Sequence, residues 1–158
     1  FVRGYEVQLS LPFEMVHPML DGFGLFTSAT FLDGKLGDNN ERVPGLSNET
    51  YTMTFFYENS GFEARIAGTK RDDYQTENRG LSLSLVPEVK LGGKYIDAQV
   101  SYDFKDAGIK GLEGLRVSLQ GQNLTDQSDV STNGNDARQI TLYQNYGRNY
   151  MLSFNYKF

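Results

Sequence analysis

Residues that could contact a ligand gather in two long polar segments, residues 71–93 and 124–147. Both segments are rich in Asp, Asn, Thr, Gln and Gly, a composition typical of loops. Tyrosine offers an aromatic face with a hydroxyl, and arginine pairs with anionic groups through a planar fork of donors. The two types could therefore stack on sugars or pair with anionic chelates, although each residue taken singly is also an ordinary solvated loop residue. The candidate ligand-contacting residues are Tyr74, Arg79, Arg138, Tyr143 and Tyr146, with Asp129 and Asp136 in the same segments.

Catalytic and metal chemistry find little support in the residues. His17 is the single histidine and stands beside Pro18 in a short turn, without partners for a nucleophile or a metal. The acidic runs 38–41 and 126–136 carry oxygen ligands but not the spacing of an EF-hand. Residues 22–24 lack the third glycine of a dinucleotide fingerprint. We therefore expect neither an enzyme nor a cofactor.

The elements that would carry these segments are strands with one apolar face. Apolar and polar residues alternate with a period of two, which places them on opposite faces of an extended chain. In the first strand Tyr5, Val7 and Leu9 alternate with Glu6 and Gln8. Phe56 departs from the alternation in the third strand. The pattern predicts seven strands, over residues 3–13, 22–32, 50–58, 62–70, 94–104, 114–123 and 148–158.

The last predicted strand has the strongest pattern in the chain. Its apolar phase ends on a large aromatic residue, which frays unless something outside the strand holds it. Its polar phase contains Ser153 and Asn155. A C-terminal strand of a soluble sheet could show the same alternation. The apolar phase consists of Tyr150, Leu152, Phe154, Tyr156 and Phe158.

The connections between these strands alternate in length. The first, third and fifth are short and the second, fourth and sixth are long, so an up-and-down sheet would collect all long loops on one side. Outer-membrane barrels sort their loops in this way. Counting residues 81–85 as an eighth spanning strand would destroy the sorting, and we expect them to form an extracellular extension or a ribbon within the loop. Seven is odd, whereas bacterial single-chain barrels use even numbers, so the chain is predicted to belong to a larger barrel.

Composition agrees with a single all-β unit spanning residues 1–158. With 15 Lys+Arg against 20 Asp+Glu the chain lacks a nucleic-acid footprint, and with no cysteine it has no disulfide framework. Eighteen consecutive apolar residues occur nowhere, whereas a membrane-spanning strand needs only about 9–11 alternating residues. Because a strand begins almost at once and no signal peptide precedes it, the chain is expected to be part of something longer.

Several short motifs, in their order and spacing, resemble the C-terminal end of a TonB-dependent outer-membrane receptor. They cover nearly the whole chain and occupy residues 4–6, 43–47, 95–104, 122–126, 146–150 and 156–158. The resemblance implies the last seven strands of a 22-stranded antiparallel up-and-down transmembrane β-barrel in the bacterial outer membrane. It further implies uptake of a siderophore, cobalamin, haem or oligosaccharide, driven by TonB through a plug domain that these residues do not contain.

The resemblance also implies the partners of the chain. They would be outer-membrane lipid, the remainder of the barrel with its plug, and the barrel-assembly machinery, which reads the aromatic-terminated last strand. Two alternatives stay open: a self-contained small outer-membrane barrel, and a soluble lipocalin-like binding protein. The soluble alternative requires Phe154, Val100 and Val7 to be buried together in a dry interior.

Overall fold

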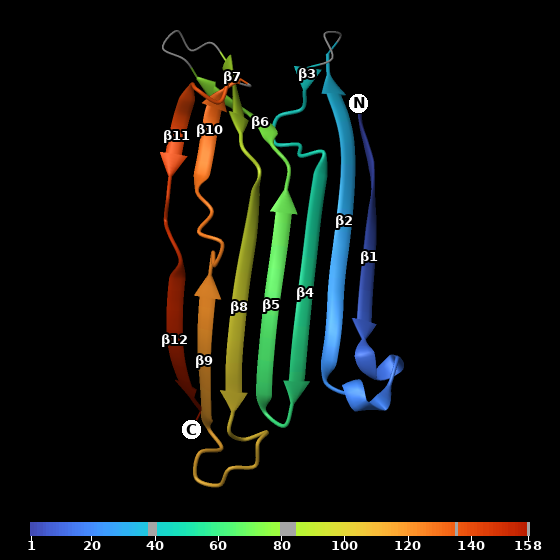
Figure 1. The fold of residues 1–158 in the computed structure, drawn as a ribbon, viewed down its shortest axis with the longest axis vertical. Helices are drawn as coiled ribbons and strands as arrows, with labels where there is room; N and C mark the ends of the chain where they lie inside the picture. The colour runs from blue at the N-terminus through green and yellow to red at the C-terminus, as the bar shows by residue number, and fades with distance from the viewer. Residues whose placement is uncertain (38–40, 80–84, 135, 158) are drawn as a thin grey trace.

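Antiparallel β-strands are the main elements of the computed structural model, which describes residues 1–37, 41–79, 85–134 and 136–157 (Figure 1). Seven principal strands form one open sheet in the order β1-β2-β4-β5-β8-β9-β12, and the short β3 (Glu41–Arg42) pairs with β2 beside this path. Neighbours in the sheet are neighbours along the chain. The bounds are β1 (Val2–Pro12), β2 (Phe23–Leu36), β4 (Glu49–Asn59), β5 (Phe62–Arg71), β8 (Gly93–Asp103), β9 (Leu115–Gln122) and β12 (Asn149–Tyr156).

Four shorter strands form a second sheet at the upper end of Figure 1, in the order β11-β10-β7-β6. Each continues one strand of the first sheet, because β6 follows β5, β7 precedes β8, β10 follows β9 and β11 precedes β12. The second sheet therefore extends four strands of the first sheet, β5, β8, β9 and β12, beyond an irregular junction. Its strands are β6 (Tyr74–Arg79), β7 (Leu85–Lys90), β10 (Asp129–Asn133) and β11 (Ile140–Gln144).

The connections are sorted as the sequence predicts. Residues 13–22, 60–61 and 104–114 join the strands at the lower end, and residues 37–48, 72–92 and 123–148 join them at the upper end (Figure 1). The first lower connection contains two single-turn helices, η1 (Phe13–Met15) and η2 (Pro18–Leu20). Among the residues described, no helix has the length and apolar character needed to span a bilayer.

Two predicted boundaries differ from the structure. The second strand continues past residue 32 to Leu36, because residues 33–36 still pair with β1 and β3. Segments 71–93 and 124–147, predicted as loops, contain the four strands of the second sheet. Of the predicted extension 81–85, residues 81–84 lie outside the described residues, and Leu85 begins β7.

The register separates an apolar face from a polar face. Direct cross-strand partners lie on the same face, and one continuous row joins Leu25, Phe55 and Ile66 through β2, β4 and β5. The next row joins Val100 to Leu119. The predicted phases are thus confirmed across the sheet.

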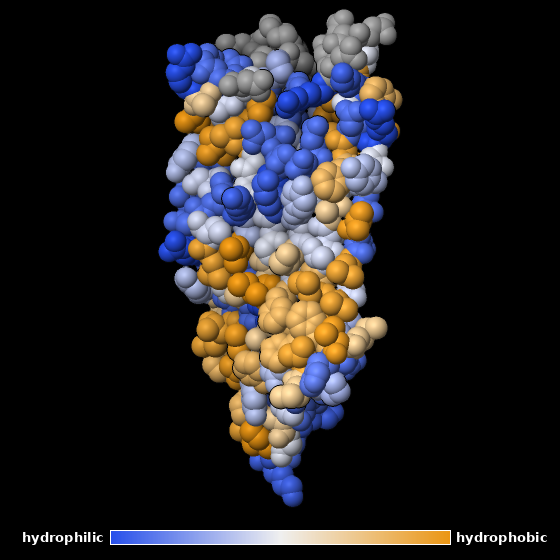
Figure 2. Space-filling model, turned by 45° about the vertical axis from the view of Figure 1, so that its right-hand side comes forward, coloured by the Kyte–Doolittle hydropathy of each residue, from blue (hydrophilic) through white to orange (hydrophobic). Residues whose placement is uncertain are grey.

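The apolar face has no second layer packed on it. Val89 is the one buried hydrophobic residue among those described, while Val7, Val100 and Phe154 are 60%, 44% and 67% exposed. The dry interior that the soluble alternative requires is therefore not formed. Figure 2 shows hydrophobic side chains gathered over the middle and lower part of one view of the molecule, below a hydrophilic upper end.

Phe56, which breaks the alternation, lies on the polar face for a steric reason. It is the direct register partner of Gly24, and a Cβ added to that glycine would lie 2.2 Å from the Phe56 Cζ. The aromatic ring therefore occupies the space that the missing side chain leaves, a known device for stabilising glycine in sheets.

One ion pair lies on the polar face of the sheet. The Arg116 guanidinium pairs with the Glu63 carboxylate, and the Ser101 hydroxyl donates to the same carboxylate at 3.0 Å. Beside them the Arg65 guanidinium donates to the neutral Gln99 amide oxygen at 3.4 Å. This face is therefore suited to border water or another polar surface.

Candidate ligand-contacting surface

The polar face continues from the first sheet into the second through a tyrosine at the top of β8. The Tyr95 hydroxyl donates to Asp129 Oδ1 at 3.0 Å, and the other oxygen of that carboxylate lies 3.3 Å from Lys90 Nζ. Tyr74 is the direct register partner of Lys90 and lies on the same face. The junction thus presents a connected set of aromatic and charged groups on one side of the protein.

A pocket of about 400 Å³ opens at this junction, between the tops of β8, β9 and β12. This volume lies in the range typical of small-molecule sites. Gln122 and Asn149 are direct cross-strand partners, so their amides lie side by side. The residues that shape it include Tyr95, Gln122, Asp129, Tyr146, Arg148 and Asn149.

Asn123 holds the wall of this pocket together. Its backbone has a φ of +51°, a region that asparagine tolerates better than most residues. Its side-chain amide donates to the carbonyls of Gln127 and Gly147 at 3.0 and 3.1 Å, and its side-chain oxygen accepts from the Gln127 backbone N–H at 2.9 Å. This one side chain therefore joins the first residues of the long 123–148 connection to its last residues.

The structure brings one of the five predicted ligand-contacting residues, Tyr146, into the pocket. Tyr74 instead stacks beneath the Arg71 guanidinium, which lies 3.8 Å from the ring centroid. Tyr143 lies on β11 opposite Val130, outside the pocket, and its hydroxyl is 3.3 Å from Ser128 Oγ. Hydrogen bonding from Ser128 and Asn145 lowers the pKa of the Tyr143 phenol. Arg79 ends β6, and its side chain lies outside the described part of the chain.

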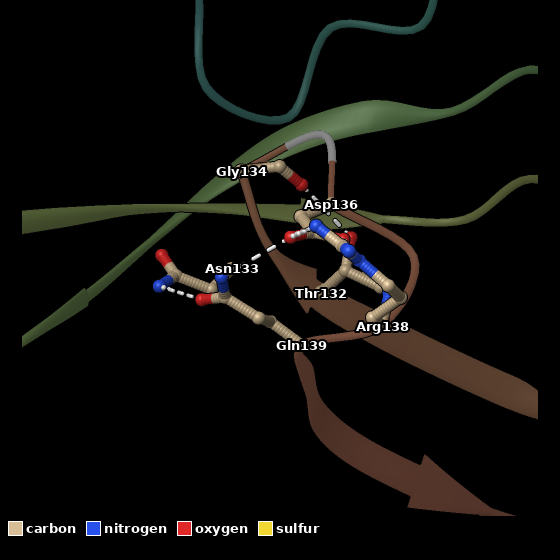
Figure 3. A network of polar contacts seen from close by, with 6 residues as sticks. All are labelled: Thr132, Asn133, Gly134, Asp136, Arg138 and Gln139. Carbon is tan, nitrogen blue, oxygen red and sulfur yellow. Dashed lines mark hydrogen bonds and ion pairs between the residues drawn. The ribbon is translucent and has the colours of Figure 1, made fainter.

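Arg138, the fifth candidate, is held at the tip of the β10–β11 hairpin (Figure 3). Its Nε and Nη2 donate to the two carboxylate oxygens of Asp136, each at 3.0 Å, and its backbone N–H donates to Oδ1 at 3.0 Å. These bonds from Arg138 lower the pKa of Asp136, and the same carboxylate raises the pKa of Arg138. The guanidinium is therefore neutralised locally, which weakens the case for Arg138 as an anion-binding residue.

Further bonds make the tip a closed network (Figure 3). Gln139 Nε2 donates to Asp136 Oδ2 at 3.2 Å, and Asn133 Nδ2 donates to Gln139 Oε1 at 2.8 Å. The Thr132 hydroxyl donates to the Gly134 carbonyl at 2.8 Å. The tip therefore presents a polar surface on which the charges of Asp136 and Arg138 are already paired.

Arg71, which sequence reasoning missed, fastens the 41–48 segment to the edge of the second sheet. Its Nε donates to Ser47 Oγ and its Nη2 to the Gly45 carbonyl, each at 2.8 Å. Ser47, 4% exposed, donates in turn to the Asp72 carbonyl at 2.7 Å, and the Gly45 N–H donates to the Gln75 carbonyl at 2.7 Å. The place of Arg71 at the start of the predicted polar segment 71–93 gave no sign of this role.

Replacing Arg71 by methionine is expected to speed amide exchange of residues 43–47 about tenfold, because two bonds from a charged donor to this segment are lost. Hydrogen exchange followed by mass spectrometry measures this. Lys70→Met is the matched control, since it removes a cation whose partner, Asp72, lies at 3.8 Å and outside that segment. Equal exchange in the two variants would show that Arg71 does not hold the segment.

His17, considered above for catalysis and metal binding, has a structural role. His17 Nδ1 accepts from the Met19 backbone N–H at 3.1 Å and so caps η2. The described residues contain no group of three or more His, Cys, Asp or Glu side chains arranged to hold a metal ion.

The class of fold follows from three observations together. An antiparallel up-and-down sheet joins only sequence neighbours, carries its long connections at one end, and exposes an apolar face opposite a polar one. This is the architecture of an outer-membrane β-barrel wall, present here as an open segment.

Comparison with known structures supports this fold class. The chain is similar to the ferric citrate transporter FecA in its unliganded crystal form, with a TM-score of 0.71 and 20% sequence identity. The match covers 99% of this chain and 24% of that protein, so the chain spans about a quarter of its length. No family model matches the chain, and no curated protein matches it.

Proposed function

We propose that the chain is the C-terminal part of the barrel wall of an outer-membrane receptor that imports a scarce ligand with energy coupled through TonB. The ligand classes are a siderophore, a cobalamin, haem or an oligosaccharide. The observation that carries the proposal is the fold likeness to the transporter FecA over 99% of the chain. The sorted connections and the uncovered apolar face support it.

The proposed environment assigns a role to each face. The apolar face contacts lipid, and the hydrogen-bonded wall lets a polar interior cross the bilayer without unpaired backbone groups. The polar face, with its compensated pair of Glu63 and Arg116, borders the lumen and its plug. The second sheet extends the wall toward the outside, where the ligand arrives.

The exposed side of β12 supports the proposed recognition by the barrel-assembly machinery. Its aromatic and aliphatic side chains are all more than half exposed, as a recognition strand requires. Phe158 lies outside the described residues. The described members of this set are Tyr150 (64%), Leu152 (57%), Phe154 (67%) and Tyr156 (54%).

Strand direction bears on the remainder of the barrel. β1 and β12 form the two ends of a seven-strand antiparallel path, so they run in the same direction (Figure 1). Direct pairing of β1 with β12 would be parallel, and antiparallel closure requires an odd number of further strands between them. A barrel of about 22 strands satisfies this parity, whereas a self-contained barrel of these seven strands does not.

The transport proposal predicts that solute uptake through the full-length gene product depends on TonB. Cells that produce it are tested for accumulation of radiolabelled ferric chelates, cobalamin, haem and oligosaccharides, with and without TonB. Accumulation of one of these solutes is expected to fall to background when TonB is deleted or the proton gradient is collapsed. Uptake that persists unchanged without TonB would overturn the proposal.

A further inference from the structure

The pocket at the top of β8, β9 and β12 carries an inference about the class of ligand, and it rests on the proposed receptor function. We infer that this pocket binds a neutral polyhydroxylated ligand, a carbohydrate unit, and does not bind an anionic chelate. Three features of the pocket support this ligand class: its free polar groups, its low net charge and its one exposed aromatic ring.

Free hydrogen-bonding groups converge at the pocket. The side-chain amides of Gln122 and Asn149 lie side by side and have no hydrogen-bond partner within the described residues. Arg148 uses only its Nε, which donates to the Leu124 carbonyl at 3.0 Å. Its two terminal nitrogens therefore have no hydrogen-bond partner among the described residues. Amides both donate and accept, as hydroxyl groups do, so the amide pair matches neighbouring hydroxyls of a sugar ring.

The charge of the pocket argues against an anionic ligand. Asp129 is the one carboxylate of the lining and Arg148 its one guanidinium. Because the Lys90 ammonium also lies 3.3 Å from Asp129, these three groups together carry a single positive charge. The guanidinium at the hairpin tip is paired as well, with Asp136. A multiply charged chelate needs several unpaired cationic donors, and among these residues only the Arg148 guanidinium is without a carboxylate partner.

The aromatic ring of the pocket is open for stacking. Tyr146 is 78% exposed, and its hydroxyl donates to Gln144 Oε1 at 3.1 Å, which anchors the rim of the ring. An anchored amphipathic ring offers an apolar face to the C–H side of a sugar while hydroxyls bond elsewhere. With a volume of about 400 Å³ the pocket accommodates a small part of a longer glycan.

The test measures binding by the purified full-length gene product in detergent. The probes are an array of neutral oligosaccharides, including maltotriose, xylotriose and chitotriose, together with citrate and ferric citrate as anionic comparisons. Saturation-transfer NMR or calorimetry is expected to detect at least one neutral oligosaccharide. Tyr146→Ala is expected to weaken this binding at least tenfold, while Tyr146→Phe stays within twofold because the ring is kept.

Two further variants test the side-chain amides, and a third controls for the loss of an exposed tyrosine outside the pocket. Gln122→Ala and Asn149→Ala are each expected to weaken binding about fivefold, the effect of one lost hydrogen bond. Tyr143→Ala leaves it unchanged, because this tyrosine is 60% exposed on the neighbouring β11 but lies outside the pocket.

The outcomes separate this inference from the transport proposal. Binding of no neutral glycan, binding insensitive to Tyr146→Ala, or Tyr146-dependent binding of citrate or ferric citrate in place of sugars would each overturn the ligand class. TonB-dependent uptake would survive any of those results. Uptake independent of TonB, with glycan binding intact, would instead defeat the transport proposal alone.

Discussion

Replacing Leu119 by arginine is expected to destabilise the membrane-inserted protein by about 2–4 kcal/mol, the cost of an arginine on the lipid side of a barrel near the midplane. Leu119 is 52% exposed and lies in a row with Val100 and Leu152, its direct partners on β8 and β12. On the proposed lipid face, a guanidinium at this position would meet acyl chains. Urea unfolding of the full-length gene product in phospholipid vesicles, followed by its mobility on gels, measures the change.

Gln120→Arg is the matched control, one residue along the same strand. Gln120 pairs with Gln99 and Met151 on the polar face, so an arginine there is expected to cost about 1 kcal/mol or less. The ratio of the two effects tests the orientation of the sheet directly. A larger cost at Gln120 than at Leu119 would place the polar face against lipid and contradict the proposed environment.

The strands and their faces could be predicted because the barrel architecture makes their pattern simple. In the proposed barrel, with lipid on one side and water on the other, every spanning residue belongs to one of two phases, and the period of two is visible without knowledge of tertiary contacts. The exception, Phe56, could not be predicted, because its reason is the missing side chain of Gly24 on the neighbouring strand. That contact exists only after register is known.

The second sheet was not predictable from the same signal. β6 reads Tyr-Gln-Thr-Glu-Asn-Arg, which is polar in both phases, so hydrophobic alternation gives no indication of a strand. Backbone pairing to β7 over six residues forms it instead. Polar strands of this kind are expected where both faces of a sheet meet water, beyond the bilayer.

The sequence indicated the residue types of the candidate site, but only partly which positions come together to form it. Tyr146 was found because an exposed tyrosine in a long polar segment is conspicuous. Gln122 and Asn149 were missed because they lie 27 positions apart and meet only through the β9–β12 register (149 minus 122). Arg138 was found by type, but its charge is paired with Asp136 two residues away. Sites built from cross-strand neighbours require the register before their members can be recognised.

The turn between β4 and β5 is a position where a single added side chain should strongly disturb the lower end of the sheet. Ser60 and Gly61 have φ values of +48° and +81°, and the two-residue hairpin matches the right-handed twist of its strands. A Cβ on Gly61 would lie 2.3 Å from the Asp103 carbonyl oxygen, at the end of β8, and 2.8 Å from the Ala107 backbone nitrogen, in the connection that follows. Gly61→Val is therefore expected to cost about 2–4 kcal/mol, from the left-handed backbone and the clash together.

Gly108→Val separates these two causes. Gly108 also has a positive φ, +71°, but nothing lies within 4 Å of its added Cβ. This variant is expected to lose only about 1–2 kcal/mol, the cost of the backbone conformation. The same urea titration in vesicles compares the two. If Gly61→Val costs no more than Gly108→Val, the Asp103 carbonyl can move away from the added side chain freely. The bond from the Asp103 N–H to the Gly61 carbonyl, at 2.7 Å, would then not hold the β4–β5 turn firmly against the end of β8.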